Sequence, residues 1–389
     1  MGLTLAEVRG RRLAAQGLRA ADGAAGLDAT TPDEVVSRFL AVQSQEYLPA
    51  QWGLAQRLAA DGRPSAAAVG AAIDRGDLLR THVLRPTWHF VTPADAGWLI
   101  ALSAERVHRA NGTYYARHGL AGAVADRVLA TIETAVADGH RTRTEVGAAL
   151  GDAGLPSTGN ALAYCLMLAE LERVVISGAS VGAQRTYAPF PERVPDVASR
   201  ARDEGLAELA ERYLRARGPV TERDLSAWSG FGLRDVRTAL ADAADRTDGR
   251  IARIDGPDGT AYWHDAEIAE RHRDATSARP DEAAPPPRVD LLQAYDEYVM
   301  GYAAPRSYLL PTKHPSADSA EFPLHAMLAD GVMCGRWAPT VGPRSATVRI
   351  VPWRRMSRAE VVARDDAIAG FERFLGRPIA VEVERVARH

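Results

Sequence analysis

The chain has 389 residues, of which 46% are hydrophobic and 25% are charged, and its formal net charge is −3. This length predicts two to four modules, and the near-neutral charge argues against a protein that coats DNA by charge alone. The sequence lacks an apolar run of about 18 residues, which excludes a membrane span, and its two cysteines, Cys165 and Cys334, suit neither a disulfide framework nor a zinc site.

The amphipathic N-terminal segment, MGLTLAEVRGRRLAAQGL, lacks the apolar stretch of a secretory signal. We therefore expect a cytoplasmic protein, associated with the nucleoid if it acts on DNA. The first module then begins with helical patterns over residues 32–42 and 66–77. Residues 78–92, LLRTHVLRPTWHFVT, alternate like two paired strands and end its regular part.

The second module repeats an order of helix, turn, helix and hairpin. A short helix is expected from Thr144 to Leu150, a longer apolar helix over ALAYCLMLAEL (161–171), and a hairpin over residues 174–190. This order is typical of the winged helix, a relative of the helix-turn-helix.

The third module shows the same order most clearly. Thr221 is expected to cap the helix ERDLSAWS, with Asp224 three residues later completing an imperfect capping box. A second helix follows over residues 234–243, and Gly-Pro-Asp-Gly at 256–259 predicts the turn of a hairpin.

The rest of the chain predicts a Pro-rich linker and a small sheet. Strand-like alternation appears in residues 289–302, 325–339 and 346–353, and a helix over 358–376 precedes a last strand. The predicted organisation is 1–120, N-terminal helix and first winged helix; 121–204, second winged helix; 205–270, third winged helix; 271–288, linker or exposed loop; 289–389, β-rich region. The fold class is therefore α+β, with three tandem winged-helix motifs.

The second helices of modules two and three are poor candidates for reading base sequence. The helix at 161–171 is apolar nearly all round, and the helix after Gly232 offers Arg234 and Arg237 among several acids. Base readers instead present Arg, Asn or Gln to the groove. This favours modules that serve as architecture around one specialised site over a transcription factor.

Unusual side chains gather in the hairpin of the first module: Arg80, His82, Arg85, Thr87, Trp88 and His89. Side chains alternate between faces along a strand. We expect Thr87 and His89 on one face, Trp88 and Phe90 on the other, and Arg80 and His82 together on the opposing strand. Such a hairpin could present Arg and His to phosphates while its apolar face packs inward. The alternative is a structural hairpin with a buried aromatic pair and a solvated polar face.

Four segments of the chain resemble the winged-helix DNA glycosylases of the AlkZ and YcaQ type: AVQSQEYLPAQWGLAQRL, LLRTHVLRPTWHFVTPAD, LLQAYDEYVMGYAAPRS and DGVMCGRWAP. The most specific feature is Gln-x-Gln at Gln43 and Gln45. YcaQ-type members carry a carboxylate at the second motif position, so Gln45 places the chain nearer the AlkZ type. Ser44 departs from the apolar middle residue that is usual there.

The resemblance implies three tandem winged helices in a C shape around duplex DNA that contains alkylated purines. It implies hydrolysis of the N-glycosidic bond of bulky N7- or N3-alkylated purines, including the unhooking of interstrand crosslinks. Members of the AlkZ type often protect producers of DNA-alkylating antibiotics, so DNA repair or self-resistance is the expected role.

The two glutamines suit this chemistry. An i, i+2 pair on a helix points about 200° apart, but the helical pattern stops near Val42 and Pro49 follows, so a turn or extended link is expected there. Alkylation makes the attached purine cationic, so it leaves readily with the bonding electrons, and the sugar gains oxocarbenium character. Two amide carbonyls could position a water and stabilise this charge. We predict Gln43 and Gln45 as catalytic residues, although glutamines that merely cap or bond the adjacent backbone are the alternative.

Further expectations concern what surrounds the motif. The only lysine in the sequence is Lys313, far along the chain from the motif. A Schiff-base lyase needs an amine nucleophile. We therefore expect a monofunctional glycosylase without metal or cofactor, acting as a monomer. The candidate DNA contacts are Arg57, Arg80, His82, Arg85, Thr87, Trp88 and His89.

Two other functions remain open from the sequence. A non-catalytic winged-helix regulator would bind one undamaged sequence tightly. A protein-interaction scaffold would show no DNA affinity that falls with salt.

Overall fold

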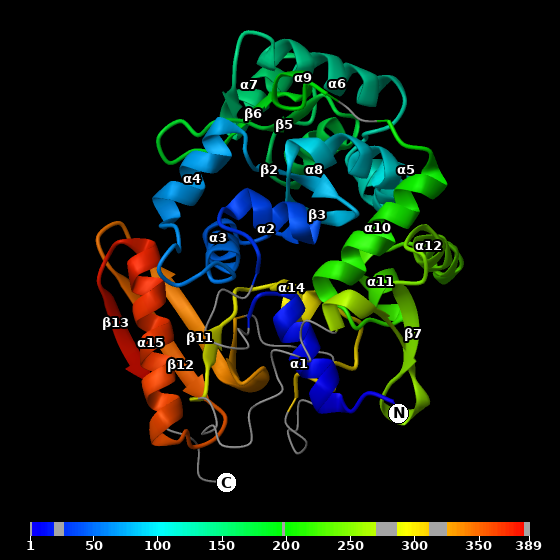
Figure 1. The fold of residues 1–389 in the computed structure, drawn as a ribbon. Helices are drawn as coiled ribbons and strands as arrows, with labels where there is room; N and C mark the ends of the chain where they lie inside the picture. Colours follow the sequence, from blue (N-terminus) through cyan, green and yellow to red (C-terminus); the bar gives the residue numbers. More distant parts are fainter. Residues whose placement is uncertain (1, 19–26, 197–198, 270–285, 311–324, 385–389) are drawn as a thin grey trace. The chain divides into compact units, whose positions relative to one another are not determined.

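The computed structural model describes residues 2–18, 27–196, 199–269, 286–310 and 325–384, and its fold is α+β, as predicted (Figure 1). Within these ranges no helix is long and apolar enough to cross a membrane. Contacts within the chain divide it into two compact units. Unit 1 comprises Met1–Phe39, Gln45–Val69 and Ala207–His389, and unit 2 comprises Leu40–Ser44 and Gly70–Leu206.

The helices and strands of unit 2 are β1 (Val42–Gln43), β2 (Leu79–Val83), β3 (Arg85–Val91), α5 (Pro93–Arg117), α6 (Ala123–Val136), β4 (Arg141–Thr142), α7 (Arg143–Asp152), α8 (Gly159–Leu171), β5 (Val175–Ser177), β6 (Thr186–Pro189) and α9 (Phe190–Arg193). Those of unit 1 are α1 (Leu5–Ala15), α2 (Pro32–Phe39), α3 (Tyr47–Ala55), α11 (Glu222–Ser229), α12 (Leu233–Arg246), β7 (Ile251–Asp255), the 3-10 turn η1 (Pro257–Gly259), β8 (Ala261–Asp265), β9 (Val289–Leu291), α14 (Glu297–Met300), β10 (Ala326–Ala329), β11 (Val332–Val341), β12 (Ala346–Pro352), α15 (Arg358–Leu375) and β13 (Ile379–Val383). Two helices, α4 (Ala66–Arg75) and α10 (Arg202–Arg217), contain residues of both units.

In unit 2, β3 lies between β1 and β2 in an antiparallel three-stranded sheet, and α5 packs against β2 and β3. The predicted order of helix, helix and hairpin is present as α7, α8 and β5–β6, with the short β4 added beside β6. Thr142 and Glu145 form a capping box that starts α7.

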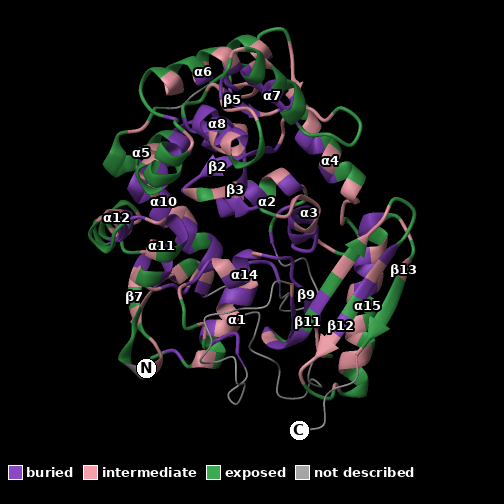
Figure 2. Ribbon diagram, turned by 180° about the vertical axis from the view of Figure 1, so that it is seen from behind, coloured by how far each residue is buried: buried purple, intermediate pink, exposed green. Residues whose placement is uncertain are grey.

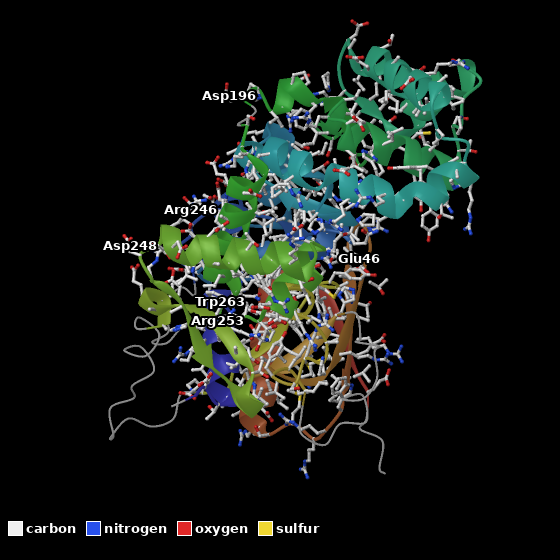
Figure 3. All side chains as sticks on the ribbon, turned by 90° about the vertical axis from the view of Figure 1, so that its right-hand side faces the viewer. Glu46, Asp196, Arg246, Asp248, Arg253 and Trp263 are labelled. Carbon is white, nitrogen blue, oxygen red and sulfur yellow. The ribbon has the colours of Figure 1, made fainter. Side chains whose placement is uncertain are left out.

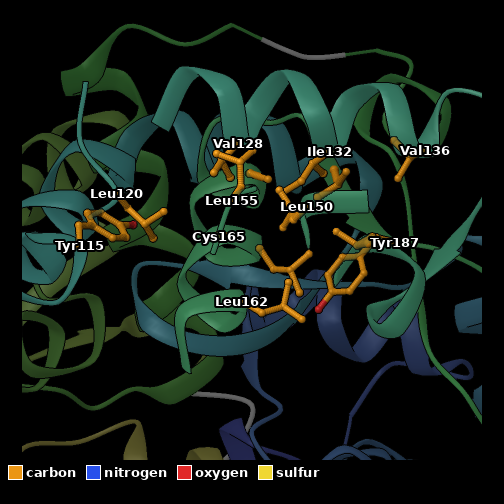
Figure 4. Close-up of a cluster of buried hydrophobic side chains, with 14 residues drawn as sticks. Tyr115, Leu120, Val128, Ile132, Val136, Leu150, Leu155, Leu162, Cys165 and Tyr187 are labelled. Carbon is orange, nitrogen blue, oxygen red and sulfur yellow. The ribbon is translucent and has the colours of Figure 1, made fainter. Parts of the chain in front are cut away.

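The core of unit 2 lies beneath α6, whose apolar positions recur at helical spacing (Figure 4). Val128, Ile132 and Val136 point inward from α6, while its opposite side is exposed (Figure 2). They pack with Leu150 of α7 and Leu162 of α8, which joins these three helices in one core.

In unit 1, α11, α12 and the β7–β8 hairpin follow the same order, and their positions agree with the prediction. Thr221 caps α11 and forms a capping box with Asp224, as expected. Gly230, with a φ of 75°, ends α11 in the left-handed conformation that glycine adopts without strain. On the hairpin, the guanidinium carbon of Arg253 lies 4.7 Å from the ring centre of Trp263 (Figure 3).

The C-terminal region of unit 1 is a five-stranded sheet in the order β13-β12-β11-β10-β9. All its pairings are antiparallel except that of β12 with β13. The helix α15 packs against it, and Phe371 of α15 contacts both Trp52 of α3 and Trp337 of β11 edge to face. This aromatic cluster anchors the sheet to the N-terminal part of the same unit.

The prediction of a strand over residues 289–302 was largely wrong. Only Val289–Leu291 forms a strand, and the short helix α14 follows. The physical reason is the buried Asp296, whose carboxylate accepts a hydrogen bond from the backbone N–H of Tyr298 and caps α14. Most of the predicted linker at 271–288 lies outside the described residues.

Three buried ion pairs hold unit 1 together, and each is linked by hydrogen bonds to its surroundings. Arg12 pairs with Asp224 at 2.9 Å, Arg57 with Asp296 at 2.7 Å, and Arg217 with Glu297 at 2.6 Å. Gln16 connects two of these pairs: its carbonyl oxygen accepts from Arg57, and its amide donates to the backbone oxygen of Glu297. Such pairs need this degree of hydrogen bonding, because burial removes both charges from water.

Candidate active site

The Gln-x-Gln segment is extended and then bent, as the sequence predicted. Helix α2 ends at Phe39, and Leu40 takes a φ of 68°, which breaks the helix. Val42 and Gln43 then pair with Phe90 and His89 of β3. The chain bends after Ser44, and α3 starts with Pro49 in its first turn, where proline is tolerated.

Gln43 is buried, with 3% of its surface exposed, and its amide is held in one orientation. Its Oε1 accepts a hydrogen bond of 3.0 Å from Nη2 of Arg85. This bond identifies the oxygen end of the amide, and an amide oxygen has a second lone pair that can accept from another donor. Gln43 can therefore act as an oriented acceptor.

The residue between the glutamines is held on both of its peptide groups. The N–H of Ser44 donates to the carbonyl oxygen of Trp88 at 2.8 Å. The carbonyl oxygen of Ser44 accepts from Nε and Nη2 of Arg80 at 3.1 and 3.0 Å. Ser44 is fully buried, so these bonds replace those that water would make.

Arg80 is itself supported by an aromatic ring and a buried pair. Its guanidinium carbon lies 4.0 Å from the ring centre of Trp88, and the ring of His82 lies 4.0 Å from the same ring. His82 Nδ1 forms a short contact with Oε2 of Glu170 on α8. Burial raises the pKa of the Glu170 carboxyl above its usual range, and His82 and Arg80 act in the opposite direction.

Gln45 differs from Gln43 because its side chain is exposed. Glu46, which follows it (Figure 3), is half-buried and lies 3.0 Å from Nε2 of His325 within unit 1. Burial lowers the pKa of His325, and the Glu46 carboxylate acts in the opposite direction. Glu46 is thus tied to the C-terminal region of unit 1.

The sequence suggested that the hairpin could present Arg80 and His82 to phosphates, but in the structure both side chains are buried. The strand register sets Arg80 opposite Phe90 and His82 opposite Trp88, so all four side chains share one face. Every residue of β2 is buried. The predicted separation of a polar face from an apolar face was therefore wrong, because Arg80 and His82 share a face with the aromatic residues and bond to partners inside the protein.

Four of the seven candidate DNA contacts are buried: Arg57, Arg80, His82 and His89. Arg57 donates to both carboxylate oxygens of Asp296, at 2.7 and 2.9 Å, which gives it a structural partner. His89 Nδ1 lies 2.9 Å from the carbonyl oxygen of Thr87. These side chains lie within hydrogen-bonding distance of partners inside the protein, so we do not include the four among the proposed DNA contacts.

The other three candidates, Arg85, Thr87 and Trp88, are half-buried at the end of the hairpin. Arg106 of α5 lies near Arg85, and burial together with this second cation lowers the pKa of Arg106. The structure therefore gathers positive charge close to Gln43.

Two residues that surround the motif, Arg106 and Glu170, were not among the candidates from the sequence. Arg106 lies in a helix that gave no functional signal. Glu170 had one signal that could have been used, because it is the only charged residue in α8, Gly159–Leu171. A single carboxylate in an apolar helix needs a partner, and here that partner is His82.

Across the described part of the chain, no group of three or more His, Cys, Asp or Glu side chains could hold a metal ion. Cys165 and Cys334 are both buried free thiols.

A family model described as DNA glycosylase AlkZ-like matches residues 36–388, which is most of the chain. The chain therefore belongs to the AlkZ-like DNA glycosylase family. Among solved structures it is similar to the Streptomyces sahachiroi DNA glycosylase AlkZ, with a TM-score of 0.75 and 20% sequence identity, over 99% of this chain and 100% of that one. This likeness shows a shared fold. A search of curated proteins gave no match.

Proposed function

We propose that this member of the DNA glycosylase family hydrolyses the N-glycosidic bond of bulky N7- or N3-alkylated purines in duplex DNA. Gln43 and Gln45 are the proposed catalytic residues. The observation that carries the proposal is the fixed Gln43-Ser44 segment, in which Arg85 orients the Gln43 amide and hydrogen bonds hold the next peptide. Preorganised dipoles of this kind stabilise charge that develops in a transition state.

The chemistry needs no strong base. An N7- or N3-alkylated purine is cationic and leaves with its bonding electrons, while positive charge builds on the sugar. The Gln43 Oε1 atom, an acceptor with two lone pairs, can face this charge or align the attacking water. The exposed Gln45 supplies a second neutral amide for the same purpose.

The mechanism proposed here ends at the abasic site. A lyase step through a Schiff base would require an amine nucleophile. The sequence contains a single lysine, Lys313, far along the chain from the motif. We therefore expect strand breaks only after alkali treatment.

DNA contact is proposed for the three helix-helix-hairpin segments, taken as winged helices, and for Arg85, Thr87 and Trp88. The cations Arg85 and Arg106 would attract phosphates near the motif. Bulky adducts fit poorly into a snug pocket for a flipped base. N7-linked interstrand crosslinks are therefore included among the candidate substrates, and repair or self-resistance to an alkylating toxin is the proposed role.

The test uses a duplex with a single N7-methylguanine, incubated with excess protein and then treated with alkali. We expect Gln43→Ala and Gln45→Ala each to lower the single-turnover rate by about 10²–10³-fold. Gln51→Ala removes another buried glutamine, outside the motif, and is the matched control whose rate should stay unchanged.

Lesion release that persists in both variants would reject the assignment of the two glutamines. A wild-type protein that releases no base but binds one undamaged sequence tightly would indicate a winged-helix regulator instead.

A further inference from the structure

The carbonyl of Ser44 belongs to the same planar peptide as the N–H of Gln45, so whatever fixes this carbonyl also fixes the backbone that enters Gln45. In the described structure this carbonyl accepts two hydrogen bonds from Arg80, at 3.1 and 3.0 Å. The N–H of Ser44 is fixed separately by Trp88 at 2.8 Å. Both peptide groups of the middle motif residue are therefore set by the hairpin.

An arginine suits this task better than a lysine would. The planar guanidinium offers Nε and Nη2 to one oxygen in a fixed geometry, whereas an ammonium is a point charge on a flexible stem. Arg80 has 7% of its surface exposed, so its donors face the protein interior. Its own backbone N–H donates to Ser177 Oγ at 2.7 Å, which holds the strand that carries it.

Trp88 and the His82–Glu170 pair restrict where the guanidinium can move. Trp88 contacts both Arg80 and His82 through its ring, and Glu170 holds His82 from α8. The carboxylate of Glu170 also attracts Arg80 through space. The motif is thus connected through Arg80 to the core helix α8 of the same unit.

We propose that Arg80 is a positioning residue that orients the peptide between the two glutamines and is not a phosphate contact. The inference rests on the proposed glycosylase function for its catalytic consequence. The claim that Arg80 holds residues 43–46 in place does not depend on that function.

The experiment compares wild-type protein with Arg80→Lys and with the control Arg75→Lys, whose arginine is exposed and pairs with Asp77. Two quantities are measured on duplex with one N7-methylguanine: the single-turnover rate at saturating protein and the Kd. We expect Arg80→Lys to lower the saturated rate by about 10–100-fold, because small displacements of reacting groups are costly, while Kd changes by less than about 3-fold. The control should change neither.

A phosphate contact would behave differently. Because lysine keeps the positive charge but loses the bidentate geometry, a phosphate contact would raise Kd in Arg80→Lys, with the salt slope and the saturated rate kept. Such a result, or an unchanged saturated rate, would overturn the inference.

Hydrogen exchange provides a readout that does not depend on activity. We expect faster exchange in the peptide that covers residues 41–47 of Arg80→Lys, with α8 unchanged. Equal protection in both proteins would overturn the inference even if activity fell. Wild-type protein that is inactive on the lesion would instead reject the proposed function and the catalytic consequence, whereas the exchange result would still decide whether Arg80 holds the motif.

Discussion

At the scale of single residues, the arginines of the first hairpin have different environments despite their proximity in sequence. Arg80 is enclosed and binds a backbone carbonyl, whereas Arg85 is half-buried and binds a side-chain amide. Arg85 lies beside a second cation, Arg106, whose charge opposes it. A phosphate placed there would relieve this repulsion, so Arg85 suits DNA contact and Arg80 does not.

We predict that Arg85→Ala weakens binding to undamaged duplex by about 3–10-fold at moderate salt. It should also reduce the slope of log Kd against log salt by about one, because one phosphate contact is lost. Fluorescence anisotropy across a salt series measures both. Arg75→Ala, which removes an exposed arginine from α4, is the control. An unchanged slope for Arg85→Ala would exclude the contact.

At the scale of secondary structure, helix starts are set by local side chains that the sequence displays openly. Capping boxes begin α1, α7, α11 and α15. In α15 the N-cap Ser357 bonds the Glu360 backbone, and Glu360 bonds back to Ser357 and to Arg354. The hydrogen bonds from Arg354, assisted by those from Ser357, lower the pKa of Glu360 to about 2.

This lowered pKa predicts a pH-dependent contribution of Glu360 to stability. Because the carboxyl has a lower pKa in the folded state than its ordinary value of 4.5, its contribution is present above pH 4.5 and is lost as the pH falls toward 2. We expect Glu360→Gln to lower the free energy of unfolding by about 1 kcal/mol near neutral pH, after allowing for solvent screening. The difference should shrink through the acid range in urea denaturation.

The matched control for this prediction is Asp366→Asn, which neutralises an exposed carboxylate in the middle of the same helix. A Glu360→Gln deficit that stays constant down to the lowest pH would show that the stabilisation does not come from the charge.

At the scale of the whole molecule, the N-terminal helix α1 is joined to distant segments of unit 1 through buried charges. Arg12 of α1 pairs with Asp224 of α11, and Gln16 bonds both Arg57 and the backbone of Glu297. These partners are separated by up to 281 residues in sequence. This network therefore holds together segments of unit 1 that are far apart in the sequence.

We predict that Asp296→Asn destabilises the protein by about 3–5 kcal/mol, because it leaves Arg57 as a buried charge without its carboxylate. Replacing both partners, as in Arg57→Met with Asp296→Leu, should recover much of this loss. Urea denaturation measures both variants, and a double variant no more stable than Asp296→Asn would contradict the explanation. The salt dependence of DNA binding should not change in the double variant, since Arg57 is enclosed.

Several helix starts and turns of this protein, and the identity of its motif, could be predicted from residues close together in the chain. Thr221, Asp224 and the Gly-Pro-Asp-Gly turn predicted α11 and the following hairpin, because caps and turns depend on residues close together in the chain. The extended link at Gln43 was also predictable, since a helical pattern ended before a proline.

Which polar side chains face solvent, and which support other residues, depended on packing between distant segments. Alternation along β2 placed Arg80 and His82 on one face, but every residue of β2 is buried, because α5 and α8 pack against this strand. The burial of Arg57 depended on Asp296, 239 residues away. A charged side chain can be buried only where an oppositely charged partner lies beside it. Which distant segments come together is set by tertiary packing and not by the local sequence.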